Sequence, residues 1–183
     1  MHPQRFLLKP FPGEGNPAGL TIGGSIGRRA EILSVRCEVR GDLSIVSIPA
    51  AAEAPRRLDR LWEETCFELF LGAADSDAYW ELNLSPSGHW NAYRFHRYRE
   101  GMRVEPAITS LLFDVRRDSA ALILTVEFGI GMIAPAGRDL AATVAVVINT
   151  HDGGRSHWAS VHPSSHPDFH RRDGFALILP GEG

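Results

Sequence analysis

The sequence predicts an all-β protein, an antiparallel β-sandwich or jelly roll, and two observations lead to this prediction. Short segments that alternate between apolar and polar residues, or that are apolar throughout, recur along the chain between polar turns. No segment of ten residues shows the 3.6-residue periodicity of an amphipathic helix. About eight to ten short strands of this kind fold most simply as two packed antiparallel sheets.

Length and composition indicate one globular domain spanning residues 1–183. A chain of 183 residues can bury a sizeable core, and 44% hydrophobic with 22% charged residues is ordinary for a globular protein. The formal charge of -3 gives no electrostatic basis for binding nucleic acid or an anionic membrane. Because we find neither an export signal nor a run of roughly 20 apolar residues, we expect a cytoplasmic protein, whose oligomeric state the sequence leaves open.

The N-terminal third is expected to contribute one clear strand. Residues 1–30 are rich in proline and glycine, which predicts an irregular segment with at most a short edge strand near 20–22. Residues 31–40 alternate cleanly between apolar and polar side chains, as a half-buried strand does. A turn then leads into a further extended run at 43–48, and residues 49–60 break the pattern as a loop.

The central region, residues 58–102, holds three of the four tryptophans and the richest polar pattern. In an extended chain, successive side chains point to opposite faces. Residues 62–71 then divide into an apolar set and an opposite set with an aromatic ring and carboxylates. The apolar set is Thr65, Phe67, Leu69 and Leu71. The opposite set is Trp62, Glu64, Cys66, Glu68 and Phe70.

A hairpin follows, and its turn sets the strand register. Residues 85–88 place proline and glycine where a type I turn with a left-handed closing residue needs them. The register pairs Asn83 with Asn91 and Glu81 with Tyr93 on a polar face, which we expect to continue the Trp62 and Glu68 face. The other face pairs Trp80, Leu82 and Leu84 with Arg94, Ala92 and Trp90.

The C-terminal half predicts the remaining strands. Residues 110–116 and 120–128 form a second hairpin, and the nearly continuous apolar run 140–149 indicates a strand buried on both faces. A glycine turn leads into a strand at 155–161, and a last strand at 175–179 closes the domain.

Three glutamates of the central region, Glu64, Glu68 and Glu81, could take several roles. Two opposed carboxylates can act as the acid and base of glycoside hydrolysis. Carboxylates also accept hydrogen bonds from sugar hydroxyls, coordinate Ca²⁺, form ion pairs, or remain solvated at strand ends. Their spacing is not specific for any of these roles, so we assign no catalytic residue and expect no enzyme activity.

Five of the eight histidines lie between residues 151 and 170: His151, His157, His162, His166 and His170. Their spacing matches neither a helical metal-binding pair nor a Cys/His finger, so we expect no transition-metal centre. Haem would need axial ligands such as a histidine and a methionine, and no C-x-x-C-H sequence is present. Phosphate-loop, nucleophile-elbow and dinucleotide-binding motifs are also missing, so we expect no cofactor.

Two tryptophans, Trp62 and Trp158, stand among polar residues. Indole rings in such places can act as apolar platforms for a pyranose ring, whose hydroxyls are then met by carboxylates, amides and arginine. The alternative is that both are ordinary core aromatics. We expect the two tryptophans to converge, from distant parts of the chain, on one pocket that solvent can reach.

Three stretches resemble the DOMON-like proteins related to family 9 carbohydrate-binding modules. They are LWEETCFELFL, YWELNLSPSGHWNAY and HWASVHPSSHPDFHRRDGFALIL, and the resemblance covers about residues 58–179. It implies a β-sandwich in which two tryptophans enclose a sugar, and it carries these roles to Trp62 and Trp158. It carries the polar roles to Glu68, Asn83 and Arg94.

We therefore expect a β-sandwich module that binds a small molecule, with a carbohydrate or polyol as the best candidate. The candidate ligand-binding residues are Trp62, Glu64, Glu68, Glu81, Asn83, Tyr93, Arg94 and Trp158. Three alternatives stay open: a glycoside-type hydrolase that uses Glu68 with Glu64 or Glu81, a protein-interaction module, and a haem-binding protein.

Overall fold

The computed structural model describes residues 3–16, 18–134 and 137–181, and nearly all of its regular structure is β. The strands are β1 Gln4–Pro10, β2 Thr21–Arg29, β3 Ile32–Arg40, β4 Cys66–Ala73, β5 Tyr79–Leu84, β6 Trp90–Phe95, β7 Arg103–Val104, β8 Phe113–Arg117, β9 Ala121–Gly129, β10 Leu140–Asn149, β11 Arg155–Ala159 and β12 Leu177–Leu179. Three short 3₁₀ helices accompany them: η1 Leu43–Ile45, η2 Leu61–Glu63 and η3 Arg172–Gly174. Among the described residues, no helix has the length and apolar character needed to span a bilayer.

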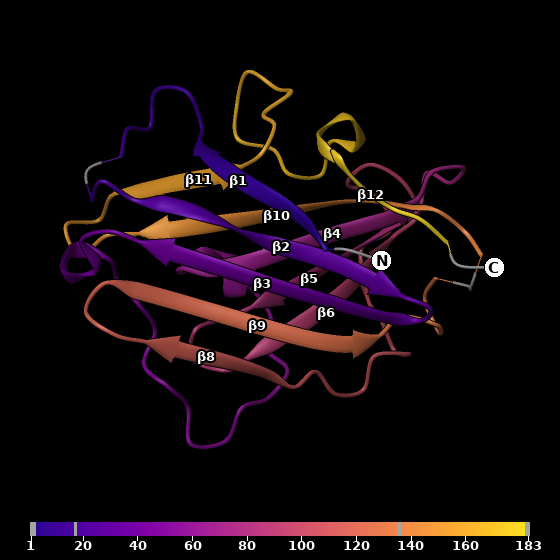
Figure 1. Ribbon diagram of the computed structural model, residues 1–183, viewed down its shortest axis with the longest axis horizontal. Coiled ribbons are helices and arrows are strands. Elements are labelled where there is room, and N and C mark those ends of the chain that lie inside the picture. The colour runs from indigo at the N-terminus through magenta and orange to yellow at the C-terminus, as the bar shows by residue number, and fades with distance from the viewer. Residues whose placement is uncertain (1–2, 17, 135–136, 182–183) are drawn as a thin grey trace.

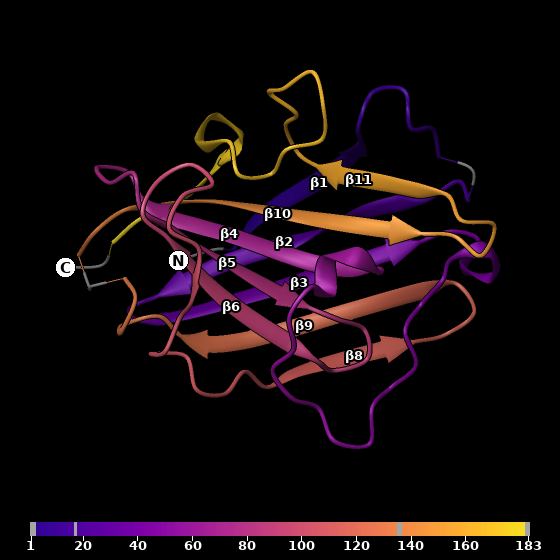
Figure 2. The same cartoon turned by 180° about the vertical axis from the view of Figure 1, so that it is seen from behind.

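The strands form two facing layers, which we name from their position in Figure 1. The front sheet has the order β8-β9-β3-β2-β1, and the back sheet has the order β11-β10-β4-β5-β6-β7, with β12 also paired to β10. Figure 2 shows the back sheet from its outer side. The named strands pair antiparallel throughout, and a short β1–β11 pairing at Lys9 and Pro10 joins the two layers. The antiparallel β-sandwich predicted from the sequence is confirmed.

The main hydrophobic core fills the space between the two sheets. From the back sheet it takes the apolar side chains of β4 that alternation predicted, Phe67, Leu69 and Leu71, all at most 2% exposed. From the front sheet it takes the inward side chains of β2 and β3, such as Ile22 and Leu33. Burial of apolar surface at roughly 25 cal/mol per Å² is the main stabilising contribution to such a sandwich. A second, smaller apolar cluster lies on the outer face of the back sheet.

The central hairpin has the predicted register. Glu81 pairs with Tyr93 and Asn83 with Asn91, while Leu84 pairs with Trp90 on the core face. Gly88 adopts a left-handed φ of 92°, as the turn prediction requires. Local turn chemistry and the two-residue period of a strand were therefore enough to place every side chain of this hairpin on the correct face.

The prediction that residues 1–30 are irregular is wrong, because β1 and β2 lie in this segment as well-paired strands of the front sheet. The glycines of β2 are sites of close approach and not strand breakers. A Cβ atom on Gly24 would lie 1.9 Å from the Arg36 carbonyl oxygen and 2.9 Å from Cζ of Phe6. Glycine is the residue that lets the strands approach this closely at this point.

The expected extended run at 43–48 is also wrong. Residues Leu43–Ile45 form η1, whose first turn is capped by the side chain of Asp42, which accepts a hydrogen bond from the Ser44 amide at 3.0 Å. Only Val46 makes a bridge, to Thr150. The local capping interaction therefore overrides the apolar pattern.

Candidate functional site

A pocket of about 320 Å³ opens on the outer face of the back sheet. Its floor comes from β4, β5, β6 and β10, and its rim comes from β11, from η2 and from the loops after β6 and β11. The same face of the sheet is seen in Figure 2. The pocket lies on the polar face predicted from the central hairpin, on the side opposite the main core.

Two glutamates form part of the floor. Glu68 of β4 lies opposite Asn83 of β5, and Glu81 of β5 lies opposite Phe70 of β4, so the two carboxylates occupy diagonal positions on neighbouring strands. Glu68 is 5% exposed and Glu81 is 4% exposed. Both line the pocket.

Burial and mutual repulsion change the acidity of this pair. Burial, followed by the negative charge of Glu81, holds the pKa of Glu68 well above its usual range. Burial also raises the pKa of Glu81 to about 7, although the Asn83 hydrogen bond and the charge of Arg99 act in the opposite direction. The pair therefore holds at least one proton under conditions in which exposed glutamates are fully ionised.

Hydrogen bonding around the pair is incomplete. Asn83 Nδ2 donates to Glu81 Oε1 at 2.8 Å, whereas Asn83 Oδ1 is buried without a hydrogen-bond partner. The Glu68 carboxyl group forms no side-chain hydrogen bond within residues 3–16, 18–134 and 137–181. The carboxyl groups of Glu68 and Glu81 therefore face whatever occupies the pocket, whereas Asn83 is fully buried and does not line it.

Trp62 forms one wall of the pocket. It is half-buried and packs edge-on against Tyr93, with ring centroids 5.7 Å apart and an interplanar angle of 67°. The Tyr93 hydroxyl donates to Asp59 at 2.9 Å, and Asn91 donates to both Tyr93 and Asp59. This buried network holds Tyr93 in place and thereby fixes the orientation of the indole.

His170 covers the glutamate pair from the loop after β11. Its Nδ1 lies 2.8 Å from the Tyr79 hydroxyl, and its Nε2 lies 3.8 Å from Glu81 Oε2. Its ring makes edge contacts with Phe70 and Phe95. Burial, followed by the charge of Arg99, lowers the pKa of His170 to about 4, so the imidazole is neutral near pH 7.

Two loops meet beside the pocket through a buried carboxylate. Asp168 accepts hydrogen bonds from Arg99 at 2.9 Å, from the Tyr98 hydroxyl at 2.6 Å and from the His170 amide at 3.1 Å. Burial acts to raise the pKa of Asp168, but the hydrogen bonds from Tyr98 and Arg99 outweigh it and lower the pKa. The Arg99 charge is therefore balanced by Asp168.

The β11 side of the rim carries two more fixed polar groups. Arg155 donates from Nε to Asn149 Oδ1 at 2.9 Å. His157 places its amide and Nδ1 each 2.7 Å from the carboxylate of Glu14. Both side chains line the pocket with their positions set by partners outside it.

The structure brings five of the eight predicted ligand-binding residues to one place. Trp62, Glu68 and Glu81 line the pocket, and Asn83 and Tyr93 lie on the same face as buried partners of Glu81 and Trp62. Trp62 reaches the pocket from η2 and not from a strand, since β4 begins only at Cys66. Whether these residues contact a ligand stays a prediction.

The other three predicted residues lie elsewhere. Glu64 follows η2 and is exposed outside the pocket lining, because the alternation assumed for it begins two residues later. Arg94 lies on the opposite face of the sheet, with its guanidinium 5.4 Å from the Trp80 ring centroid. Trp158 is 2% exposed in the main core, and its Nε1 donates to Ser156 Oγ at 2.8 Å.

The expected convergence of Trp62 and Trp158 on one pocket is therefore wrong. On β11, side chains alternate, so that Ser156 and Trp158 point into the core while Arg155 and His157 point to the pocket. The polar neighbours of Trp158 led to the wrong prediction, because the Ser156 hydroxyl accepts a hydrogen bond from the buried indole N–H.

Several pocket residues were missed by the sequence reasoning. Phe95 and His157 could have been predicted, because the two-residue alternation of their strands places each side chain on the pocket face. Arg99, Phe169 and His170 lie in irregular loops, and no local pattern links them to the sheet. Only the tertiary structure brings them to the pocket.

Three of the five clustered histidines have side-chain environments that the structure defines. His157 and His170 belong to the pocket rim, while His162 Nε2 lies 2.9 Å from the Lys9 carbonyl oxygen. In the part of the chain that the structure describes, nowhere do three or more His, Cys, Asp or Glu side chains gather as potential metal ligands.

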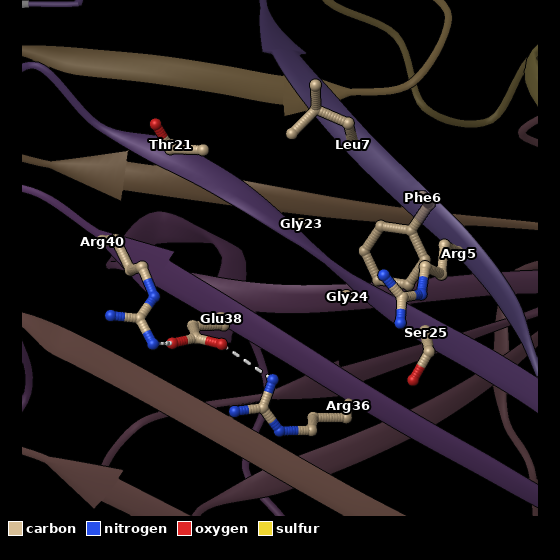
Figure 3. Close-up of a pocket in the computed structure, with 10 residues that line it drawn as sticks. All are labelled: Arg5, Phe6, Leu7, Thr21, Gly23, Gly24, Ser25, Arg36, Glu38 and Arg40. Carbon is tan, nitrogen blue, oxygen red and sulfur yellow. Dashed lines mark hydrogen bonds and ion pairs between the residues drawn. The ribbon is translucent and has the colours of Figure 1, made fainter.

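A larger groove, of about 470 Å³, lies on the outer face of the front sheet (Figure 3). Its most prominent polar groups are arginines that are already paired, since Arg36 lies 2.8 Å from Glu38 and Arg40 also pairs with Glu38. Phe6, its one aromatic lining residue, is 8% exposed. Exposed ion pairs of this kind are weak and satisfy each other, so the back-sheet pocket is the better candidate site despite its smaller volume.

Comparisons with known proteins identify structural relatives only. No protein-family model and no curated protein sequence matches the chain. A solved structure described as a candidate carbohydrate-binding protein from Bacteroides uniformis superimposes with a TM-score of 0.69 at 12% identity, covering 98% of this chain and 87% of that one. A family 9 carbohydrate-binding module from Caldicellulosiruptor kristjanssonii, in complex with glucose, gives a TM-score of 0.54 at 10% identity and covers 92% of this chain and 80% of that one.

A further structure of a family 9 module from the same organism, in complex with cellotriose, gives a TM-score of 0.50 at 12% identity, with 86% of this chain and 71% of that one covered. The resemblance noted in the sequence thus reappears at the level of the fold. The chain has a fold similar to that of family 9 carbohydrate-binding modules.

Proposed function

We propose that this protein binds a carbohydrate or polyol in the back-sheet pocket. The observation that supports the proposal most strongly is the placement of a half-buried indole, Trp62, beside two buried carboxyl groups, Glu68 and Glu81. A sugar ring has an apolar face that packs on an aromatic ring and hydroxyl edges that donate hydrogen bonds to carboxylates. The pocket offers both surfaces within about 320 Å³, enough for a sugar unit.

The solved relatives support the same proposal. Their descriptions name carbohydrate binding, glucose and cellotriose, and they share the fold that forms the floor of the pocket. The sequence resemblance to DOMON-like proteins is part of this proposal and rests on the motifs of residues 58–179.

The pocket favours binding over glycoside hydrolysis. Hydrolysis needs two carboxyl groups that flank the scissile bond from opposite sides. Here Glu68 and Glu81 rise from neighbouring strands of one sheet, so both approach a ligand from the floor. Glu64, the third glutamate considered for such a pair, is exposed outside the pocket. A carboxylate pair on one side is suited to holding a ligand.

A calorimetric sugar titration tests the proposal. Monosaccharides and short oligosaccharides, glucose and cellotriose included, are titrated into the wild type and into Trp62→Ala. We expect saturable binding of at least one sugar and a loss of at least about tenfold in affinity in Trp62→Ala, because the ring platform is removed.

Trp90→Phe serves as the matched control, since Trp90 is an aromatic residue of the main core and lies outside the pocket lining. It should keep the wild-type affinity. Equal affinity in the wild type and Trp62→Ala, or no binding of any sugar in the panel, would contradict the proposal.

A further inference from the structure

The pocket floor has more hydrogen-bond acceptors than donors. Glu68, which lines the floor, has no side-chain hydrogen bond among the described residues, and the Oδ1 atom of its cross-strand neighbour Asn83, buried outside the lining, also has no partner. Glu81 Oε2 forms no side-chain hydrogen bond among the described residues, because His170 Nε2, at 3.8 Å, is too far away for one. A buried acceptor without a partner destabilises the site, so this floor favours a ligand group that brings several donors.

Within the described residues, neither glutamate forms an ion pair with a lysine or arginine, although the charge of Arg99 acts on both. The guanidinium of Arg99 is bound to Asp168 at 2.9 Å. His170 is held neutral by burial. On the β11 side, Arg155 is hydrogen bonded to Asn149, and His157 faces the carboxylate of Glu14. When the pair is ionised, these groups therefore do not balance its negative charge.

Apolar and aromatic surfaces surround this acidic floor. Trp62, Phe95 and Phe169 line the pocket together with Met102 and Pro167. Aromatic faces attract cations when water is excluded, and buried carboxylates attract them more strongly. This combination of aromatic walls and buried carboxylates is chemically similar to the cages in which proteins bind amine groups.

From the paired, nearly buried glutamates, the lack of hydrogen-bond donors around Glu68 and the aromatic walls, we infer that the ligand carries a primary ammonium group and is an amino sugar. This inference rests on the proposed function and narrows its ligand class. The ammonium lies between Glu68 and Glu81, and the sugar ring packs on Trp62. An ammonium group has three N–H donors and no acceptor, which complements this floor better than a hydroxyl group, which is neutral and brings an acceptor of its own.

Binding of an ammonium is coupled to proton release. The free pocket holds a proton on the glutamate pair near neutral pH, because burial raises the pKa of Glu81 to about 7 and holds the pKa of Glu68 well above its usual range. The ammonium stabilises the ionised pair, so the proton leaves when the amino sugar binds. The affinity for an amino sugar should therefore increase from pH 5 to pH 7, whereas a neutral sugar has no cause to show this increase.

Isothermal titration calorimetry tests the inference with matched ligands. Glucosamine, galactosamine and mannosamine are each compared with the parent hexose and with the N-acetylated form, in which the amine is uncharged. A chelator in every titration removes divalent cations as competitors. Runs in two buffers of different ionisation enthalpy count the protons released.

At least one amino sugar should bind at least about tenfold more tightly than its hexose and its N-acetylated form, with net proton release. In the Glu81→Gln variant, the ratio of the affinity for the amino sugar to the affinity for its parent hexose should fall close to one. Glu68→Gln should lower the same ratio. Thermal unfolding checks that each variant is folded, and the wild-type comparison remains decisive if a variant is not.

The outcomes separate the two proposals. If hexoses or N-acetylated sugars bind as tightly as the amino sugars, sugar binding stands and the amine inference is overturned. If amino sugars bind more tightly but the preference survives in folded Glu81→Gln and Glu68→Gln, the assigned site is wrong. If none of these sugars binds, both proposals fail.

Discussion

Replacing Trp158 with alanine should destabilise the protein severely, whereas replacing Trp62 should mainly remove ligand binding. Trp158 is 2% exposed in the core between the sheets, and its Nε1 donates to Ser156 at 2.8 Å. Trp62 is half-buried outside that core, and its closest aromatic neighbour is Tyr93, at 5.7 Å between ring centroids. The two substitutions therefore remove the same side chain from different environments.

The magnitudes follow from these environments. Truncating a fully buried aromatic residue costs about 3–5 kcal/mol of unfolding free energy, because apolar burial is lost and a cavity remains. For a chain of 183 residues, each 1 kcal/mol lowers the melting temperature by about 2–4 °C, which gives a drop of about 6–20 °C for Trp158→Ala. Trp62→Ala loses one aromatic contact and partial burial, about 1 kcal/mol, and should melt a few degrees lower at most.

Urea unfolding followed by far-ultraviolet circular dichroism measures both effects. Trp158→Phe, which keeps an aromatic ring in the core, is the matched control and should recover much of the loss. The reasoning would be refuted if Trp158→Ala were as stable as the wild type. It would be refuted equally if Trp62→Ala lost as much stability as Trp158→Ala, because Trp62 would then be a core residue.

Further predictions concern the glutamate pair and the β2 glycines. Glu81 holds its proton up to about pH 7 in the folded protein but loses it near 4.5 when unfolded, so unfolding releases a proton between these values and rising pH favours unfolding. The unfolding free energy of Glu81→Gln relative to that of the wild type should therefore increase from pH 4.5 to 7, by at most about 1.4 kcal/mol per pH unit. Urea unfolding at a series of pH values measures this difference. A difference that stays constant with pH would refute the ionisation argument. Gly24→Ala should prevent stable folding, because its Cβ would lie 1.9 Å from the Arg36 carbonyl oxygen. Gly129→Ala, with nothing within 4 Å of its Cβ, should melt close to the wild type, and similar melting temperatures for the two variants would contradict the close packing of β2.

Much of the fold could be predicted because its signals are local. The central hairpin combines a proline and glycine turn with a strict two-residue period, which together allow one register. The apolar run of β10 is bounded by turns and paired on both sides, as its composition predicts. Where a local rule gave the wrong answer, as for the glycines of β2, a long-range contact with Arg36 and Phe6 was responsible.

The candidate site was predictable only in part, because some of its residues follow local strand patterns and others depend on long-range contacts. Strand parity placed Glu68, Glu81 and Asn83 on one face without knowledge of the tertiary structure. Parity alone does not tell which face of a strand meets the core, so Trp158 was assigned to the ligand because its neighbours are polar. His170 and the loop that carries Arg99 reach the pocket through contacts more than 60 residues apart in sequence, such as the Arg99 to Asp168 hydrogen bond, with a separation of 69. No periodic pattern in the sequence predicts such contacts.

The indole N–H resonances in a two-dimensional ¹H–¹⁵N spectrum test the central claim most directly. The four tryptophans occupy distinct places, with Trp80 and Trp158 donating to Glu105 and Ser156 in the interior and Trp62 at the pocket. Substitution of Trp62 by phenylalanine assigns its resonance. On titration with the sugar that calorimetry identifies, the Trp62 resonance should shift in a saturable manner, while the other three move little. A sugar that binds while the Trp62 resonance stays unchanged would contradict the account.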